Sequence, residues 1–286
     1  MSSSGLSQRT LIHLYADGRV ETREDCVAVE APLELRIAGD PLAVTMRTPG
    51  HDHLLALGFL LAEGIIEGVL DVGTVQHCGR SDDPSYGSSL DLVPAPGLDW
   101  DVERVRTARR GTLTTSACGV CGRQSVDDLL ALTGVLEDSL RVLPSLVTGA
   151  PDQLRAHQVN FRQTGGTHAA AALAADGTVL AAFEDVGRHN AVDKVVGALL
   201  LGRNVGRSRD PAKALPALLM VSGRTSFEIL QKAARARIPI VASVSAPSSL
   251  AVEVATRTGI TLCAFVRDGA FNIHSHPRRL IEAALP

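Results

Sequence analysis

The sequence predicts a mixed α/β protein, α+β overall, in which a smaller β-rich N-terminal domain precedes a larger α/β domain. Two patterns predict this class. Short runs of β-forming residues, separated by turn residues, recur along the chain up to residue 93, and strands alternate with helices from about residue 125 onward. We therefore divide the chain into a β-rich domain with one helix at 1–93, a flexible linker at 94–124 and an α/β domain at 125–286.

The N-terminal domain is expected to hold six strands and one helix. Asp17-Gly18 and Gly39-Asp40-Pro41 mark turns between the β-type runs. Asp52 is placed to cap a helix whose leucines recur at helical spacing on one face. The expected strands are 11–15, 20–26, 33–37, 42–47, 75–78 and 90–93, and the expected helix is 53–66.

The C-terminal domain is expected to alternate strands and helices, after a short helix at 126–132 and a second helix that begins at Pro151 and ends at Gln163. Asp176-Gly177 is a two-residue hairpin signal. The later alternation predicts a parallel or mixed sheet with helices on its faces. The expected strands are 168–173, 179–183, 218–221, 240–244 and 261–266, and the later helices are 190–201, 226–236 and 248–256.

Four polar loops follow strands of this expected sheet, at 184–190, 222–226, 245–249 and 267–272. Loops that leave the carboxyl ends of parallel strands gather at one edge, where helix N-termini present free N–H groups. For any single serine in these loops, helix capping is the favoured explanation. The arginines at 188, 224 and 267 together favour a pocket for a nucleotide-bearing cofactor, since guanidinium groups bind phosphate oxygens.

The run Cys118-Gly-Val-Cys121-Gly is the strongest chemical signal. Its glycines leave both sulfurs accessible, and Arg123 favours the nucleophilic thiolate over the thiol. Such a pair can be a redox dithiol, half of a zinc site, a persulfide carrier or two incidental cysteines. A thioredoxin-like motif would follow a strand and begin a helix, whereas this one follows a polar, arginine-rich segment. We favour reactive sulfur on a mobile loop.

A zinc site stays open but is not favoured. A structural site needs four ligands, and the other cysteines, Cys26, Cys78 and Cys263, are isolated in the sequence. Distant Cys or His pairs could still converge in space. We expect no resident metal.

Composition and charge restrict the function further. A chain of 286 residues with 45% hydrophobic content can bury a full core, and its net charge of −3 argues against general nucleic-acid binding. The longest apolar run, 54–62, is far shorter than the ~20 residues that span a bilayer. Five cysteines make no disulfide framework, and the N-terminus lacks the charged and apolar regions of a signal peptide. We expect a cytoplasmic protein.

Five motifs carry a family signal. They are Ser116-Ala-Cys-Gly-Val-Cys-Gly122, Gln163-Thr-Gly-Gly-Thr-His-Ala169, Glu184-Asp-Val-Gly-Arg-His-Asn-Ala-Val-Asp-Lys194, Ser222-Gly-Arg-Thr-Ser-Phe-Glu228 and Phe265-Val-Arg-Asp-Gly269. Together they resemble the motifs of the formate dehydrogenase accessory sulfurtransferases, the FdhD/NarQ family. The resemblance covers nearly the whole chain.

The resemblance implies a homodimeric sulfur carrier. Such a protein accepts persulfide sulfur from a cysteine desulfurase and delivers it to the bis(molybdopterin guanine dinucleotide) molybdenum cofactor before that cofactor enters formate dehydrogenase. It also implies a C-terminal domain with a cytidine-deaminase-like, three-layer fold. The first cysteine of the pair, Cys118, would carry the persulfide, and Cys121 would assist it.

The candidate cofactor-binding residues come from two sources. The family's C-terminal binding stretch corresponds here to Phe265, Val266, Arg267, Asp268, Gly269 and Ala270. The strand-end loops and the start of the 168–173 strand add His168, Arg188, His189, Asn190, Ser222 and Arg224. Histidines at such positions more often orient a loop than transfer protons, so we include them as binding candidates only.

Two other functions remain to be tested. A zinc deaminase needs an H-x-E motif on one helix start and P-C-x-x-C on the next, but the corresponding segments here, 189–191 and 222–226, lack the glutamate and both cysteines. A cofactor chaperone that carries no sulfur would keep the pocket but would not need Cys118.

Overall fold

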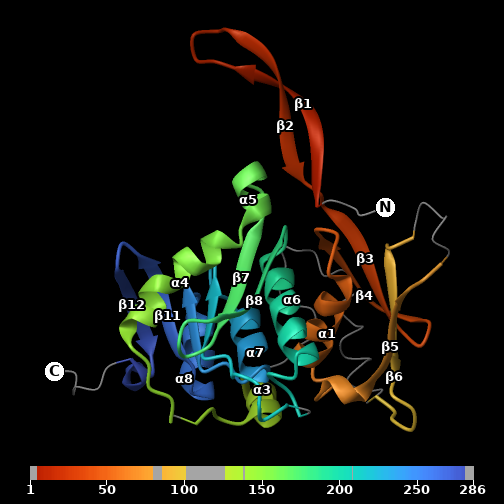
Figure 1. Ribbon diagram of the computed structural model, residues 1–286, viewed down its shortest axis with the longest axis vertical. Helices are drawn as coiled ribbons and strands as arrows, with labels where there is room; N and C mark the ends of the chain where they lie inside the picture. The colour runs from red at the N-terminus through yellow and green to blue at the C-terminus, as the bar shows by residue number, and fades with distance from the viewer. Residues whose placement is uncertain (1–4, 80–85, 101–125, 138, 208, 281–286) are drawn as a thin grey trace.

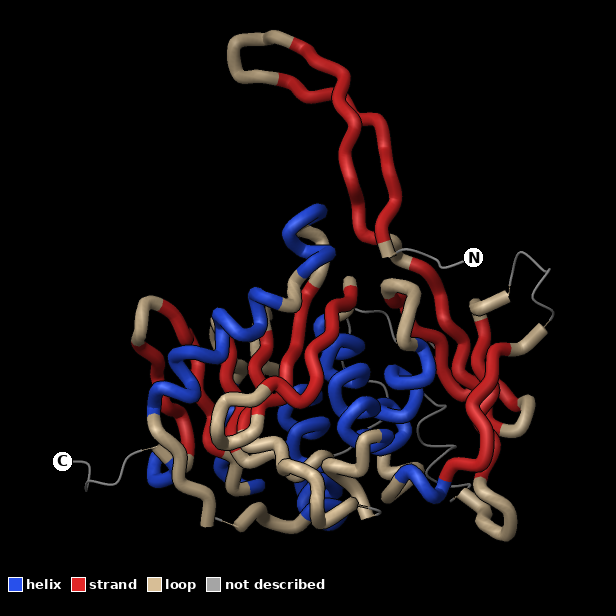
Figure 2. The backbone as a smooth tube through the Cα atoms, in the orientation of Figure 1, coloured by secondary structure: helices blue, strands red, loops and turns tan. Residues whose placement is uncertain are grey.

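The described part of the chain forms three separate sheets, with helices packed between the two larger ones. The computed structural model describes residues 5–79, 86–100, 126–137, 139–207 and 209–280. Within them lie a two-stranded hairpin, a four-stranded sheet and a six-stranded sheet (Figure 1). Figure 2 shows the helices filling the space between the larger sheets, while the hairpin projects away from the body. The mixed α/β class with a smaller β-rich N-terminal part is therefore confirmed.

The N-terminal strands divide between the hairpin and the four-stranded sheet. Strands β1 and β2 pair only with each other, and the sheet has the order β4-β3-β6-β5. Leu33 and Leu35 of β3 and Leu90 and Leu92 of β6 alternate with less buried residues and form one apolar face. The strands are β1 (Leu6–Leu14), β2 (Val20–Ala28), β3 (Ala31–Ile37), β4 (Asp40–Arg47), β5 (Val72–His77) and β6 (Ser89–Pro94), with a 3₁₀ turn at Val69–Asp71.

Helix α1 (Asp52–Ala62) covers that face and crosses α6 (Arg188–Leu201) at very close range. A Cβ atom built on Gly58 would lie 2.0 Å from the carbonyl oxygen of Asp193, and one built on Gly197 would lie 1.9 Å from that of Leu54. Two glycines, one on each helix, therefore let the two backbones touch. This crossing joins the N-terminal and C-terminal parts of the chain.

The six-stranded sheet has the order β12-β11-β10-β9-β7-β8 and helices on both faces. Along β7, Ala169 and Ala171 face one core with α4, whereas Ala170 and Ala172 face the other core with α6, α7 and α8. The sheet between two helix layers gives the three-layer arrangement that the sequence predicted. Its strands are β7 (His168–Leu173), β8 (Val179–Asp185), β9 (Leu218–Val221), β10 (Ile240–Ser243), β11 (Thr261–Arg267) and β12 (Ala270–Ser275).

The strand directions place four carboxyl ends at one edge of this sheet. Strands β9, β10 and β11 are parallel, and β7 runs antiparallel to both β8 and β9, so β8 points the same way as β9. The amino end of β7 lies at that same edge. The expected gathering of the polar loops is confirmed. The remaining helices are α3 (Val126–Thr133), α4 (Pro144–Ala156), α5 (Val159–Thr164), α7 (Phe227–Arg235) and α8 (Ser249–Thr258), with a 3₁₀ turn at Pro277–Arg279.

Several predicted boundaries are wrong. The helix expected at 151–163 begins at Pro144, contains Pro151 and breaks before Val159. Asp52 does not cap α1, because it lies inside the first turn and its carboxylate pairs with Arg47 at 2.9 Å. The sequence pattern did not predict strand β12. It begins directly after the turn at Asp268 and Gly269, within the segment 267–272 that was expected to form only a polar loop.

One apolar core includes residues from both sides of the predicted linker, among them Leu35, Leu92 and Leu219. The division at 93 and 125 stays a prediction. No helix among the described residues is long and apolar enough to cross a membrane.

Candidate functional site

The loops at the carboxyl edge of the six-stranded sheet are held against one another by backbone contacts. Thr225 forms a parallel bridge with Pro247, and its N–H donates to the carbonyl oxygen of Ala246 at 3.2 Å. The N–H of Phe265 donates to the carbonyl oxygen of Ser245 at 3.3 Å. Three consecutive strand-end loops therefore form one continuous rim.

Arg188 and His168 meet at the β9 end of this rim, next to Gly223 in the loop that follows β9. A Cβ on Gly223 would lie 3.3 Å from Nδ1 of His168 and 3.8 Å from Cδ of Arg188. Ser222 sits beside them and accepts the N–H of Ala169 at 2.9 Å. His168 and Ser222 both line a hollow of about 440 Å³. Three of the predicted binding residues are thus brought together.

Two buried polar atoms on the rim have no hydrogen-bond partner among the residues that the structure describes. They are Nε of Arg188 and Oγ1 of Thr225, a residue with 0% exposure. Buried polar groups in folded proteins are almost always hydrogen-bonded, so an unpartnered guanidinium donor close to His168, which lines the hollow, is suited to a ligand oxygen. Burial lowers the pKa of His168, and the Arg188 charge lowers it further. The imidazole is therefore neutral near pH 7, and Arg188 supplies the positive charge.

The Phe265–Ala270 stretch forms the hairpin between β11 and β12. Arg267 pairs with Ala270, and the two residues between them are Asp268 and Gly269. Their φ values are positive, at 53° and 73°. Positive φ at both central residues defines the type I′ turn, for which Asp-Gly is a typical sequence. Phe265 also has a positive φ, of 54°. Val266 is buried in the core, while the side chains of Phe265 and Arg267 line a separate hollow of about 450 Å³.

Asn190 has its hydrogen bonds within the protein. Its Nδ2 donates to the carbonyl oxygen of Met46 at 2.8 Å and to Asp185 at 3.1 Å, and its Oδ1 accepts from Thr45 at 3.2 Å. The side chain therefore ties β4 to the start of α6. A binding role for Asn190 stays a prediction, as does one for Arg224, which is exposed on the rim.

A buried ion pair that sequence reasoning missed lies beneath the rim. Nζ of Lys194 is 2.6 Å from Asp185, and the two side chains are 2% and 0% exposed. Asp185 also accepts the N–H groups of Gly187 at 2.8 Å and Thr48 at 3.2 Å. The pair fixes where α6 begins, and so it positions Arg188. Both residues belong to the 184–194 motif, but the sequence did not indicate that they pair, because Thr48, which contacts both of them, is far away along the chain.

Glu184 stabilises the start of α5. Its carboxylate accepts the N–H groups of Asn160 and Phe161, both at 2.7 Å, and the hydroxyl of Thr167 at 2.9 Å. Glu184 and Asp185 therefore each hold the start of a helix in place, α5 for Glu184 and α6 for Asp185. For Asp185, an acid just before a helix is the pattern that could have indicated this role, whereas Glu184 acts on a helix far away along the chain.

His189 joins the starts of α6 and α7, which are the two segments that correspond to the deaminase ligand positions. Its Nε2 is 3.1 Å from Oγ of Ser226 and 3.6 Å from Glu228. Burial, with added repulsion from Lys232, lowers the pKa of His189 to about 3, so the ring stays neutral. In the part of the chain that the structure describes, no three His, Cys, Asp or Glu side chains are grouped to hold a metal. The predicted carrier residues Cys118 and Cys121 lie outside the described residues.

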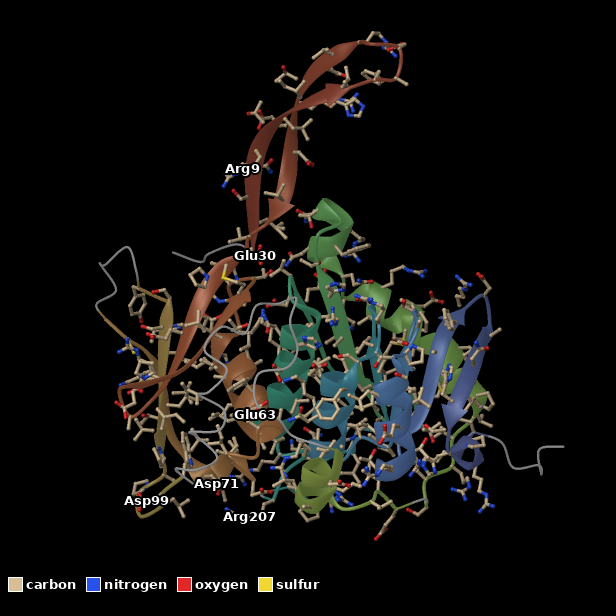
Figure 3. The ribbon with its side chains drawn as sticks, turned by 180° about the vertical axis from the view of Figure 1, so that it is seen from behind. Arg9, Glu30, Glu63, Asp71, Asp99 and Arg207 are labelled. Carbon is tan, nitrogen blue, oxygen red and sulfur yellow. The ribbon has the colours of Figure 1, made fainter. Side chains whose placement is uncertain are left out.

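Glu63 lies at the end of α1, labelled in Figure 3, near a second buried pair in which Lys232 contacts Asp193 at 2.7 Å. Burial raises the pKa of Glu63 to about 7. A carboxyl whose pKa is raised on folding makes the protein less stable as pH rises from the unfolded value, near 4.5, toward 7.

We therefore expect Glu63→Gln to raise the free energy of unfolding by on the order of 1–3 kcal/mol at pH 8, and by almost nothing at pH 4.5. Urea unfolding at both pH values measures this difference. The matched control is Glu253→Gln, at an exposed carboxylate. A gain of the same size at both pH values would contradict the prediction.

Comparisons with known proteins identify the family. The sequence profile of the FdhD/NarQ family matches residues 28–281. The chain belongs to the FdhD/NarQ family. A relative from Anaeromyxobacter sp. (strain K), named sulfur carrier protein FdhD, is 54% identical over 259 residues, which are 91% of this chain and 90% of the relative. The FdhD protein of Mycobacterium tuberculosis (strain ATCC 25618 / H37Rv), with the same name, is 46% identical over 282 residues, 96% of this chain and 98% of that one.

A solved structure supports the fold. A crystal structure from Desulfotalea psychrophila, of a protein provisionally described as a formate dehydrogenase accessory protein, superposes with a TM-score of 0.73 at 22% identity. The match covers 97% of this chain and all of that one. At this identity the likeness shows the fold alone. Membership of the FdhD/NarQ family, whose curated relatives are named sulfur carriers, supports a sulfur-carrier role for this chain.

Proposed function

We propose that this protein carries persulfide sulfur on Cys118 from a cysteine desulfurase to the bis(molybdopterin guanine dinucleotide) molybdenum cofactor, its bound substrate, and that formate dehydrogenase then receives that cofactor. We also propose that it acts in the cytoplasm as a homodimer. The observation that carries the proposal is the rim of strand-end loops, with its unpartnered Arg188 donor, in a chain that belongs to a family of sulfur carriers.

The chemistry of the rim fits the proposed substrate. Each guanine dinucleotide arm contains a pyrophosphate, for which a guanidinium group and free helix N–H groups are suitable donors. Helix α6 begins at Arg188 and α7 follows Ser226, and neither helix has a side-chain cap. The N–H groups in the first turn of each helix are therefore available to phosphate oxygens. Neutral His168 and His189 add no charge but can donate or accept a hydrogen bond.

The proposed loading step needs only one thiolate. The Cys118 thiolate attacks the terminal sulfur of the persulfide on the donor, a new S–S bond forms at Cys118, and the donor cysteine leaves as a thiolate. Arg123 and the arginines at 109 and 110 favour the thiolate of the attacking cysteine. Cys121 would assist or share the sulfur.

Intact mass spectrometry tests the proposal. We expect the wild-type protein, incubated with a cysteine desulfurase and cysteine, to gain one sulfur atom that a reductant removes and that maps to the CxxC peptide. Cys118→Ala should lose this gain, whereas the matched control Cys78→Ala, at a partly buried cysteine outside the pair, should keep it. A gain that persists in Cys118→Ala and maps to Cys121 would overturn the assignment of the carrier.

The same variants separate a carrier from a chaperone. If the protein only holds the cofactor, Cys118→Ala and Cys121→Ala will both support formate dehydrogenase activity in cells that lack the native protein. If it carries sulfur, Cys118→Ala will bind the cofactor but will not support that activity. The described part of the site does not favour deamination. That reaction needs a glutamate two residues after the histidine, and Ala191 occupies this position after His189.

A further inference from the structure

A large cavity lies at the edge of the six-stranded sheet opposite the rim. Its volume is about 910 Å³. It lies where β7 ends and where β9 and β10 begin, because Ala174 follows β7, Ala217 precedes β9 and Pro239 precedes β10. A cavity of this size is typical of a small-molecule site. None of the described residues that line it belongs to the rim, so the cavity is separate from the site of the proposed function.

One wall of this cavity is formed by a long loop, residues 202–217, which connects α6 to β9. Loops longer than about 15 residues without secondary structure are uncommon in compact domains and often have a function. This loop closes on itself. Nδ2 of Asn204 donates to the carbonyl oxygen of Ala214 at 2.7 Å, and the N–H of Asp210 donates to the carbonyl oxygen of Arg203 at 2.8 Å.

The 202–217 loop is also attached to the body of the molecule. The N–H of Arg207 donates to the carbonyl oxygen of Glu67 at 2.6 Å, and its guanidinium group pairs with Asp71. Figure 3 shows Arg207 and Asp71 at the end of the molecule away from the β1–β2 hairpin. Ligand sites are usually formed before the ligand arrives. These contacts give the cavity wall the fixed shape that such a site needs.

The loop is basic, although the net charge of the whole chain is −3. Its charged residues are the cations Arg203, Arg207, Arg209 and Lys213 and one carboxylate, Asp210. The guanidinium group of Arg207 is already paired, so three cations remain against one carboxylate. This excess of positive charge beside the cavity favours an anionic ligand.

Two guanidinium groups of the cavity lining are available to such a ligand. They belong to Arg209, in the loop, and to Arg237, just after α7, and both residues are exposed. In the part of the chain that the structure describes, neither group is paired with a carboxylate, and Nη1 of Arg237 donates to the carbonyl oxygen of Thr133 at 3.1 Å. Guanidinium groups bind carboxylate and phosphate oxygens through paired, charge-assisted hydrogen bonds.

The floor of the cavity is apolar. Leu136 and Val205 line it and are only 5% and 4% exposed. The lining also contains two carboxylates, Glu137 and Asp176. Asp176 is engaged by its own turn, where it accepts the N–H of Thr178 at 2.9 Å. The cavity therefore combines an apolar floor with guanidinium groups that have no carboxylate partner.

We propose that this cavity binds a small amphipathic anion, an apolar body the size of an acyl chain or a ring system that carries one carboxylate or phosphate group. The apolar body packs on Leu136 and Val205, which removes its surface from water. The anionic group accepts hydrogen bonds from Arg209 and Arg237. The inference goes beyond the proposed function, because the cavity lies at the other edge of the sheet from the rim and needs no sulfur transfer.

Isothermal titration calorimetry of the full-length protein with decanoate tests the proposal. We expect about one decanoate to bind per chain, with a Kd below ~100 μM. Decyltrimethylammonium has the same tail and the opposite charge, and it should bind at least ~10-fold more weakly because the two arginines repel it. Hexanoate has the same head and a shorter tail, and it should bind at least ~30-fold more weakly because it buries less apolar surface.

Three variants locate the site. Arg209→Ala should raise the decanoate Kd at least ~5-fold. Its matched control is Arg203→Ala, in the same loop but outside the cavity lining, which should leave the Kd within about two-fold of wild type. Ala214→Trp, at an exposed position of the lining, should fill part of the cavity and raise the Kd at least ~10-fold. If Ala214→Trp does not fold, the two arginine variants still decide the result.

A rim variant separates this cavity from the site of the proposed function. Arg188→Ala should leave the decanoate Kd within about two-fold of wild type, and a large loss there would place decanoate at the rim and overturn the proposal. Decyltrimethylammonium binding as tight as decanoate binding, no saturable binding below ~1 mM, or an unchanged Kd in Arg209→Ala would each overturn it too. Because no measurement here involves Cys118, failure of sulfur loading would contradict the proposed function alone.

Discussion

Lys194→Met should lower the free energy of unfolding by about 3–5 kcal/mol, because it removes one partner of a buried ion pair and leaves the other charge in place. The carboxylate of Asp185 has 0% exposure and would face a thioether instead of an ammonium group. The carbonyl oxygen of Thr48 would also lose its donor, which is now 3.0 Å away. Thermal and urea unfolding of the full-length protein measure the loss.

Two further variants make the Lys194 prediction specific. Lys213→Met changes an exposed lysine in the same way and should alter stability by less than about 0.5 kcal/mol. The double variant Lys194→Met with Asp185→Asn should recover about 1–2 kcal/mol of the loss, since the neutral amide oxygen can still accept the N–H of Gly187. Equal losses in the single and double variants would show that the buried charge is not the cause.

Gly197→Ala should also destabilise the protein strongly, by about 3 kcal/mol or more, although alanine favours helices by about 1 kcal/mol over glycine. The new methyl group would lie 1.9 Å from the carbonyl oxygen of Leu54, which belongs to a helix backbone and not to a side chain that can rotate away. Helices α1 and α6 would have to move apart. Because α6 positions Arg188, ligand binding at the rim should weaken together with stability.

Gly149→Ala is the matched control for the helix crossing. Gly149 also lies inside a helix, α4, but a Cβ there would meet nothing within 4 Å. This change should stabilise the protein by about 0.5–1 kcal/mol. Circular dichroism melts of both variants give the comparison, and similar melting temperatures for the two would contradict the close-packing argument.

Local patterns were sufficient to predict most strands and the edge where the loops gather. The Asp176-Gly177 signal gave the β7–β8 hairpin, and the strand and helix alternation after residue 218 gave the parallel strands. Local patterns predicted the wrong helix starts where tertiary contacts, and not local sequence signals, determine the structure. Asp52 has the sequence signature of a cap, yet Arg47 binds its carboxylate. Pro151 has the signature of a helix start, yet α4 begins at Pro144 and accommodates it.

The candidate site divides in the same way. The sequence predicted Arg188, His168 and Ser222 as rim residues, because glycine, serine and arginine after strands are typical of phosphate-binding loops. It gave no indication that Thr225 would be buried without a partner, or that Lys194 would lie beneath the rim. These two features depend on residues far away along the chain, which only folding brings within contact distance.

By itself the sequence determined the fold class, the order of the strands and helices from β7 to β11, and the family, since periodicity, turn residues and motifs are local properties of the chain. Only the tertiary structure decided that Gly58 and Gly197 share one helix crossing, that Asp185 and Lys194 fix the start of α6, and that the first two strands form a projecting arm. The physical reason is that burial and pairing depend on contacts between residues distant in sequence. The free energies of these contacts arise only when folding brings the residues together.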